Sequence, residues 1–199
     1  MVARVENISF DAKIRAGRVK TFLALGDFEM DESTISDPVK QEDYFAVGDR
    51  LAELGVTASS GIVVLPENLK DVEAKTDFVY SSSSTDLLKL FRLNNIEASS
   101  PSAQPLTERR NHDYTLYLPI LFYSAAYLAE NPQAMSVTLG VISNYATEFL
   151  KGYAGGGKVD ISFAIETHKT KTKSVKKYSY SGPPKQLSTL LKFVESQDE

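Results

Sequence analysis

Segments near both ends of the sequence alternate apolar and polar residues with a period of two, a pattern that predicts β-strands. Residues 8–14 and 19–25 show this alternation and are separated by a turn signal at Gly17, so we expect an N-terminal β-hairpin. The clearest alternation lies in residues 159–166, and a lysine-rich connection leads from it to a return strand containing residues 178–180. A second hairpin is therefore predicted near the C-terminus.

Other segments carry helical spacing or the end signals of helices. Residues 37–55 open with an Asp-Pro pair suited to a helix N-terminus and close on a glycine, and residues 86–93 follow a serine-rich cap. Residues 187–194 place apolar side chains at helical spacing. At the centre, the uncharged residues 114–129 and the residues 131–153 predict a pair of apolar helices. On the second of these helices, the expected core-facing residues are Met135, Leu139, Ile142, Tyr145 and Phe149.

The remaining segments complete the predicted fold. The apolar run 61–65 predicts a buried strand, residues 77–80 predict a further strand or a sheet edge, and the Ser- and Pro-rich residues 97–113 predict a long loop. We therefore expect an α+β fold: a mainly antiparallel or mixed sheet from N- and C-terminal hairpins, packed with a central apolar helix pair and flanking helices. The length favours a single domain over residues 1–199, with a possible subdivision around 97–113.

The composition removes most of the usual catalytic groups. The sequence has no Cys and only two His, His112 and His168. No thiol nucleophile, thiolate metal site or redox pair can form without cysteine, and two histidines far apart leave little room for a triad or a multi-histidine metal site. We therefore expect no catalytic residues, no metal site and no cofactor, and we predict that the protein is not an enzyme.

Charge and hydropathy set the expected location. The net charge of −4 argues against a general nucleic-acid-binding surface, and the absence of cysteine fits a reducing cytoplasm. Residues 1–6 are not followed by an apolar run, so no secretory signal is expected. The uncharged run 114–129 is shorter than the roughly twenty residues needed to span a bilayer. A cytoplasmic protein without membrane association is the expectation.

The segment 168–177 is rich in lysine and offers candidates for binding a polyanion. Lysines at alternate positions of an extended chain share one face, where they can follow a phosphate backbone or meet an acidic protein. The same pattern is typical of a hairpin tip whose lysines protect an exposed strand edge from aggregation. The polyanion-binding candidates are Lys169, Lys171, Lys173, Lys176 and Lys177.

The segment 108–113 is the densest cluster of reactive side chains. Arg109, Arg110 and His112 are candidates for binding an anion, and His112 beside Asp113 is suited to moving a proton. Neighbouring residues do not normally point at one target, and Asp113 is equally suited to capping a helix. Enzymatic use of this loop is therefore an alternative, and not the preferred reading.

Two further segments resemble phosphate-binding loops. Gly152, Gly157 and Lys158 have the spacing of a P-loop, but Val159 replaces the hydroxyl residue and a predicted helix precedes the loop where a strand is required. A helix-to-strand hinge explains this segment better. The serines of 81–84 stand before a predicted helix, where free N–H groups can hold an anion or where the chain is simply capped.

The central apolar surface is broad, and we base the prediction of a protein-binding function on this breadth. Two such apolar helices expose more apolar surface than a small sheet covers, and the surplus is expected to bury against another protein or a second copy of the chain. The candidate partner-binding residues are Leu118, Phe122, Tyr127, Val137 and Val141. We therefore predict a non-catalytic binding or accessory subunit of a larger, bacterial assembly. The alternatives are a nucleic-acid-binding module using 168–177, and an enzyme using 108–113.

Overall fold

The computed structural model describes residues 38–57, 60–102, 107–109, 115–151, 157–169 and 172–196. Its strands are β1 (Val39–Tyr44), β2 (Ile62–Leu65), β3 (Val79–Ser81), β4 (Ala98–Ser99), β5 (Thr107–Arg109), β6 (Thr115–Tyr123), β7 (Lys158–Lys169) and β8 (Thr172–Gly182). Its helices are α1 (Val47–Glu53), α2 (Ser84–Leu93), α3 (Ala125–Glu130), α4 (Ala134–Phe149) and α5 (Ser188–Ser196), with short 3₁₀ turns η2 (Lys75–Asp77) and η3 (Pro184–Gln186).

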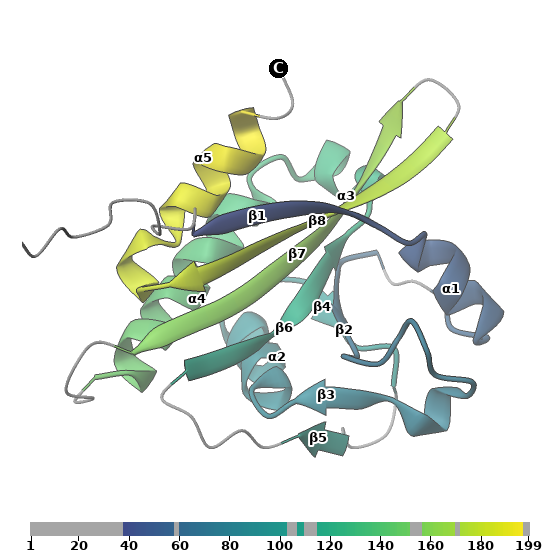
Figure 1. Cartoon of the computed structure of the whole chain (residues 1–199), viewed down its shortest axis with the longest axis horizontal. Helices are drawn as coiled ribbons and strands as arrows, with labels where there is room; N and C mark the ends of the chain where they lie inside the picture. Colours follow the sequence, from purple (N-terminus) through teal and green to yellow (C-terminus); the bar gives the residue numbers. More distant parts are fainter. Residues whose placement is uncertain are drawn as a thin grey trace, which may run out of the picture. The chain divides into compact units, whose positions relative to one another are not determined.

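A six-stranded sheet in the order β1-β8-β7-β6-β2-β4 forms the centre of these residues (Figure 1). The β1–β8, β8–β7 and β6–β2 pairs are antiparallel, whereas β7–β6 and β2–β4 are parallel. The expected combination of helices and strands around a mixed sheet is thus confirmed. Strands β3 and β5 pair separately in parallel. The predicted N-terminal hairpin lies outside the described residues, and the single-domain prediction over 1–199 reaches beyond them as well.

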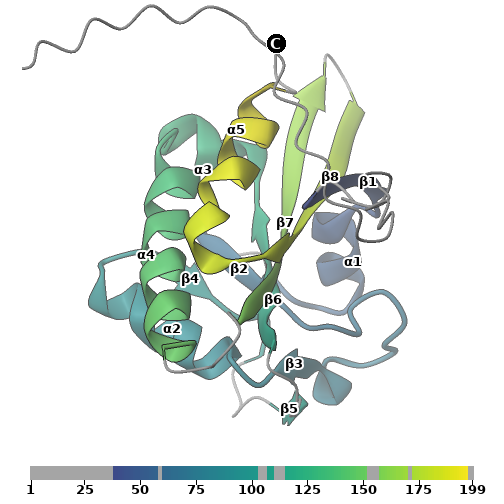
Figure 2. The same ribbon diagram turned by 60° about the vertical axis from the view of Figure 1, so that its left-hand side comes forward.

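Alternation along β7 separates the two faces of the sheet. Val159, Ile161, Phe163 and Ile165 are at most 5% exposed. They share a face with Tyr178, whose ring packs against Phe193 of α5. Helices α2, α4 and α5 lie on one side of the sheet (Figure 2). Tyr180 and Tyr178 of β8 stand opposite Ile161 and Phe163 and extend the same apolar layer. The polar residues between them, starting with Asp160, therefore face the other side of the sheet.

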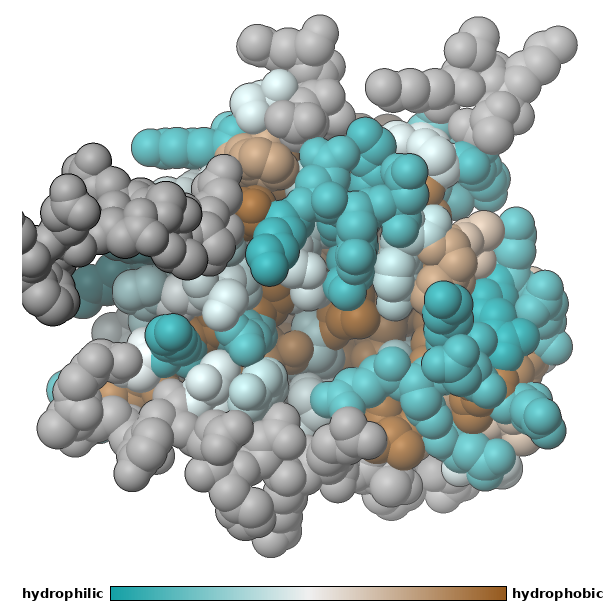
Figure 3. Space-filling view, in the orientation of Figure 1, coloured by the Kyte–Doolittle hydropathy of each residue, from teal (hydrophilic) through white to brown (hydrophobic). Residues whose placement is uncertain are grey.

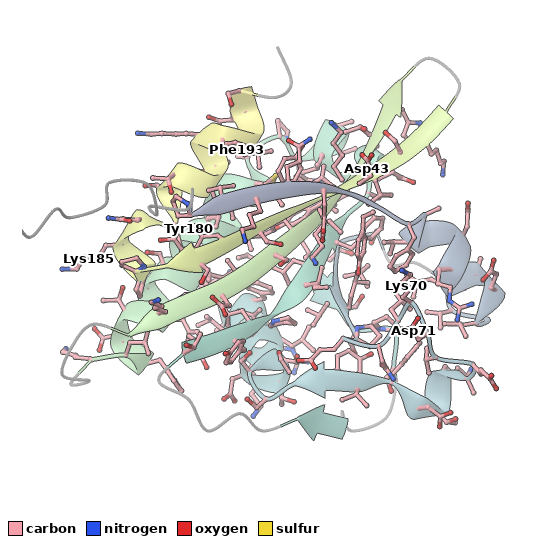
Figure 4. The ribbon with its side chains drawn as sticks, viewed as in Figure 1. Asp43, Lys70, Asp71, Tyr180, Lys185 and Phe193 are labelled. Atoms are coloured by element: carbon pink, nitrogen blue, oxygen red, sulfur yellow. The ribbon has the colours of Figure 1, made fainter. Side chains whose placement is uncertain are left out.

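The second face is covered at one end by α1 and the segment 66–78. Val47 and Leu51 of α1 are fully buried there. Arg50 ties the two parts together, because its Nε donates to the carbonyl of Leu69 at 3.2 Å and its Nη2 donates to the carbonyl of Val72. Figure 4 labels Lys70 and Asp71 in this turn. Among the described helices, none lies over β1, β8 and β7 on this side (Figures 1 and 2).

The helix predicted over residues 114–129 is wrong, and with it the central apolar helix pair. Residues 115–123 form β6, which is paired on both sides by β7 and β2. A strand buried on both faces reads as a continuous apolar run, so the pattern alone does not separate it from a buried helix. The register shift between Tyr117 and Ile120 accommodates Pro119, which has no N–H to give to a ladder.

The helix predicted over residues 37–55 is half correct. Residues 39–44 form β1, which pairs with β8 from Val39 opposite Tyr180 to Tyr44 opposite Val175. Pairing with a long partner strand outweighs the weak helix preference that an Asp-Pro start conveys. The predicted end is confirmed: Gly55 has φ 68°, a left-handed conformation that glycine adopts without strain.

Other predicted elements are confirmed by the structure. The apolar run 61–65 contains β2, whose residues are all buried, and residues 77–80 lead into β3. Helices α2 and α5 cover the predicted segments 86–93 and 187–194, and α4 covers most of 131–153. No helix among the described residues has the length and apolar character needed to cross a membrane.

Burial of the Tyr80 side chain leads us to expect that the protein loses stability at alkaline pH. Its side chain is fully buried against Phe78, and burial raises its pKa from 10.0 to about 12. Because the pKa is higher in the folded state, the neutral Tyr80 side chain contributes to the free energy of unfolding. This contribution is complete below the unfolded-state pKa of 10.0 and is lost as the pH rises through about 12. We expect urea unfolding midpoints to fall across this window, and to fall less steeply in Tyr80→Phe. An equal fall of the urea midpoint with pH in the wild type and in Tyr80→Phe would contradict the raised pKa of Tyr80.

Candidate functional site

Helix α4 has an apolar side that its own chain covers incompletely. Val137, Val141, Tyr145 and Phe149 follow one another at intervals of four residues, so they lie along one side of the helix; we call them the α4 stripe. Val137 and Phe149, at its two ends, are each 50% exposed, and the two residues between them are partly buried. The buried residues of α4 are Met135, Thr138, Leu139, Ile142 and Ala146.

Helix α2 ends on an exposed apolar residue. Leu93, its last residue, is 80% exposed. Asn95 and Ile96, which follow it, line a groove of about 390 Å³ together with Val137 of the α4 stripe. At the other end of α2, the charge of Asp86 adds to the effect of burial in raising the pKa of Tyr145. The residues that follow α2, Asn95 and Ile96, therefore lie at the Val137 end of the α4 stripe.

The structure separates the predicted partner-binding residues into two groups. Leu118 and Phe122 belong to β6 and are 7% and 2% exposed, and Tyr127 of α3 is 9% exposed. These three side chains are part of the protein's own core. Val137 and Val141 lie on the α4 stripe. Tyr145 and Phe149, which the spacing assigned to the core, belong to the same partly exposed stripe, because α4 is apolar around too much of its circumference for periodicity to locate its buried side.

A cleft of about 590 Å³ opens on the sheet face opposite α4; we call it the sheet cleft. Its floor is set by strand register: Lys40 of β1 stands opposite Ser179 of β8, which stands opposite Ser162 of β7. The Ser162 and Ser179 hydroxyls are hydrogen-bonded at 2.8 Å. In the next row, Ser181 and Asp160 are opposite each other. Small side chains on a part of the sheet that no described helix covers thus leave a hollow between longer ones.

Charged residues of both signs line the sheet cleft. Lys40 and Lys158 are exposed, and within the described residues neither forms an ion pair. Glu67, from the turn after β2, lines the side opposite Lys40. The Oδ1 atom of Asp160 is shielded from solvent and has no hydrogen-bond donor within the described part of the chain. Figure 3 shows this face of the molecule, where hydrophilic side chains surround smaller apolar areas.

The sheet cleft is not among the sites predicted from the sequence. A signal was present, because Asp160 and Ser162 alternate with the apolar residues of β7, and Ser179 and Ser181 alternate with the tyrosines of β8. That pattern shows which residues share a face. It does not show which strands become neighbours, and the cleft depends on four neighbouring strands. Among the described residues, no group of three or more His, Asp or Glu is placed to hold a metal ion.

The lysines of the β7–β8 hairpin do not form one row. Lys173 pairs with Glu166 at 3.5 Å, and Lys177 pairs with Glu42 at 2.8 Å and lies 5.5 Å from the Tyr44 ring centroid. Lys176 is opposite Ile165 in the ladder, so it faces the other side of the sheet from Lys177. Lys169 ends β7, and Lys171 lies outside the described residues. Partner carboxylates reduce the positive charge that Lys173 and Lys177 offer to a polyanion.

The predicted anion-binding segments are placed as follows. Arg109 belongs to β5 and pairs with Ser81 of β3, while Arg110 and His112 lie outside the described residues. The hydroxyl of Ser83 donates to the carbonyl of Tyr117 at 2.6 Å. The hydroxyl of Ser81 is within 3.2 Å of the Ser83 hydroxyl and 3.0 Å of the Ser84 hydroxyl. This serine cluster therefore joins the start of α2 to β6.

Comparisons with known proteins give no family for this chain. No family model, no curated protein and no solved structure matches it at a significant level. The functional conclusions below consequently rest on the geometry of this chain.

Proposed function

We propose that the protein is a non-catalytic binding subunit of a larger bacterial assembly and that it acts by contact with another protein. The contact surface is the α4 stripe together with Leu93. The observation that carries the proposal is the pair of half-exposed side chains, Val137 and Phe149, at the two ends of one apolar stripe. A cytoplasmic location, which the absence of cysteine supports, is part of the proposal.

The arrangement distinguishes this surface from ordinary surface hydrophobics. Single exposed apolar side chains are normal in soluble proteins, whereas contiguous apolar patches mark interaction sites. Burial of apolar surface contributes about 25 cal/mol per Å², so several half-exposed large side chains together supply a useful part of a binding free energy. Glu148 is the single charged residue of α4. The matching surface is therefore apolar, and salt is expected to affect the contact little.

The proposal predicts site-specific crosslinking to a protein. A photo-crosslinking amino acid at Val137, introduced in the native host, is expected to give a discrete adduct with another protein or with a second copy of the chain. The same group at Lys192, an exposed position of α5, serves as the matched control. Phe149→Glu in the crosslinking chain should abolish the Val137 adduct, because a carboxylate at the end of the stripe cannot be buried without a partner.

Sedimentation of the purified protein shows whether the partner is a second copy of the chain or a different protein. A dimer that Phe149→Glu converts to a monomer would establish a second copy as the partner, and a monomer that still crosslinks at Val137 would establish a different protein. A monomer whose Val137 position gives no adduct beyond that of Lys192 would contradict the proposal. Circular dichroism of Phe149→Glu should match that of the wild type, since the side chain is half exposed.

A further inference from the structure

The sheet cleft has the form of a small-molecule site. Helix α4, which carries the α4 stripe, lies over the other face of the sheet (Figure 2). We propose that it binds a polyhydroxylated small molecule that carries an anionic group at each end, of the class of the sugar bisphosphates. The hydroxyl groups of the ligand bind Asp160 and the serines of the floor. Its anionic ends bind Lys40 and Lys158.

The shape of the cleft follows from residue size. Ser162, Ser179 and Ser181 occupy adjacent positions of β7 and β8 on the face that no described helix covers, and their short side chains leave space above the strands. Tyr117 of β6, opposite Asp160 in the ladder, supplies an aromatic wall. The volume of about 590 Å³ lies within the roughly 300–1,000 Å³ typical of sites for small molecules.

The middle of the cleft is suited to hydroxyl groups. Asp160 lines the cleft and is only partly exposed, and a partly desolvated carboxylate is stabilised when it accepts hydrogen bonds. The Ser162 and Ser179 hydroxyls share one hydrogen bond, so the pair keeps one proton to donate to a ligand and lone pairs with which to accept. Adjacent hydroxyls of a sugar match this mixture, because each can donate to the carboxylate while accepting from a serine.

The two ends of the cleft are suited to anions. Lys40 lies in the row of Ser162 on β1, two strands away, and Lys158 lies four residues before Ser162 on β7. With strands about 4.8 Å apart and a rise of about 3.4 Å per residue, the two Cα atoms are separated by about 17 Å. Asp160 and the serines lie between them. Unlike Lys173 and Lys177, neither lysine has a carboxylate partner within the described residues, so no described carboxylate competes with a ligand anion for them.

Isothermal titration with fructose bisphosphate, fructose monophosphate, fructose and inorganic phosphate tests the proposal on the full chain. We expect fructose bisphosphate to bind at least about tenfold more tightly than the monophosphate, which corresponds to one additional charge-assisted hydrogen bond. Lys40→Gln and Lys158→Gln are each expected to remove that advantage. Asp160→Asn is expected to weaken all the sugar ligands by a similar factor and to leave inorganic phosphate unaffected.

Lys185→Gln is the matched control. Lys185 is exposed and extends away from the sheet at the left margin of Figure 4, outside the sheet cleft. It should not change the affinity for any of these probes. Equal affinity for fructose bisphosphate and inorganic phosphate, an equal loss in Lys185→Gln, or no binding at millimolar ligand would each overturn the proposal. Phe149→Glu should bind fructose bisphosphate normally, so failure here is separate from failure of the proposed protein contact.

Discussion

Phe163→Ala is expected to lower the free energy of unfolding by about 3–5 kcal/mol, a large share of the roughly 5–15 kcal/mol typical of a folded domain. Phe163 is fully buried at the centre of β7. It stands between Leu121 of β6 and Tyr178 of β8 in the ladders, and its ring centroid is 5.8 Å from that of Tyr123. Truncation removes these contacts and leaves a cavity that neighbouring strands cannot close. Equilibrium unfolding in urea measures the loss.

Phe149→Ala is the matched control for this change, because it deletes the same atoms from a half-exposed side chain. Its expected cost is about 1 kcal/mol or less in the isolated protein, as is usual for surface positions. Equal losses for the two variants would contradict the placement of β7 at the centre of the sheet and of Phe149 on the surface.

Ile142→Ala is expected to cost about 2–5 kcal/mol. Ile142 is fully buried on the side of α4 that faces the sheet, one position beyond Val141 of the α4 stripe. Alanine favours the helix as much as any residue, so the loss reports packing between layers and not helix propensity. The same urea titration applies, with unchanged helical circular dichroism at zero denaturant as the sign that α4 persists.

Val137→Ala separates the two sides of the same helix. Val137 is half exposed, so its truncation should change the unfolding free energy by about 0.5 kcal/mol or less. If Val137→Ala were as costly as Ile142→Ala in a protein shown to be monomeric, the orientation of α4 in this structure would be incorrect. If the cost appeared in a dimer and disappeared on dilution, it would report loss of the proposed contact.

The candidate surfaces were predictable to different degrees. Val137 and Val141 were identified because they widen the apolar arc of a helix beyond one face. Leu118 and Phe122 were also selected because their segment is apolar throughout. In their case the reason is that the segment is a strand buried on both faces. The sheet cleft gave no local signal beyond alternating serines, because Lys40 and Ser162 are neighbours through a strand, β8, that follows both in the sequence.

Elements whose local pattern is compatible with one structure alone could be predicted from the sequence. Alternation defines β7, helical spacing defines α4 and α5, and Gly55 ends α1 at a left-handed conformation. The tertiary structure decided that residues 115–123 are a strand, that residues 39–44 leave the predicted helix to pair with β8, and which side of α4 is buried. The physical reason is common to all three. The hydrophobic effect is not directional, so burial of apolar side chains stabilises a helix and a strand alike. A segment whose sequence fits both structures therefore forms the one for which the fold supplies a partner strand or a packing layer.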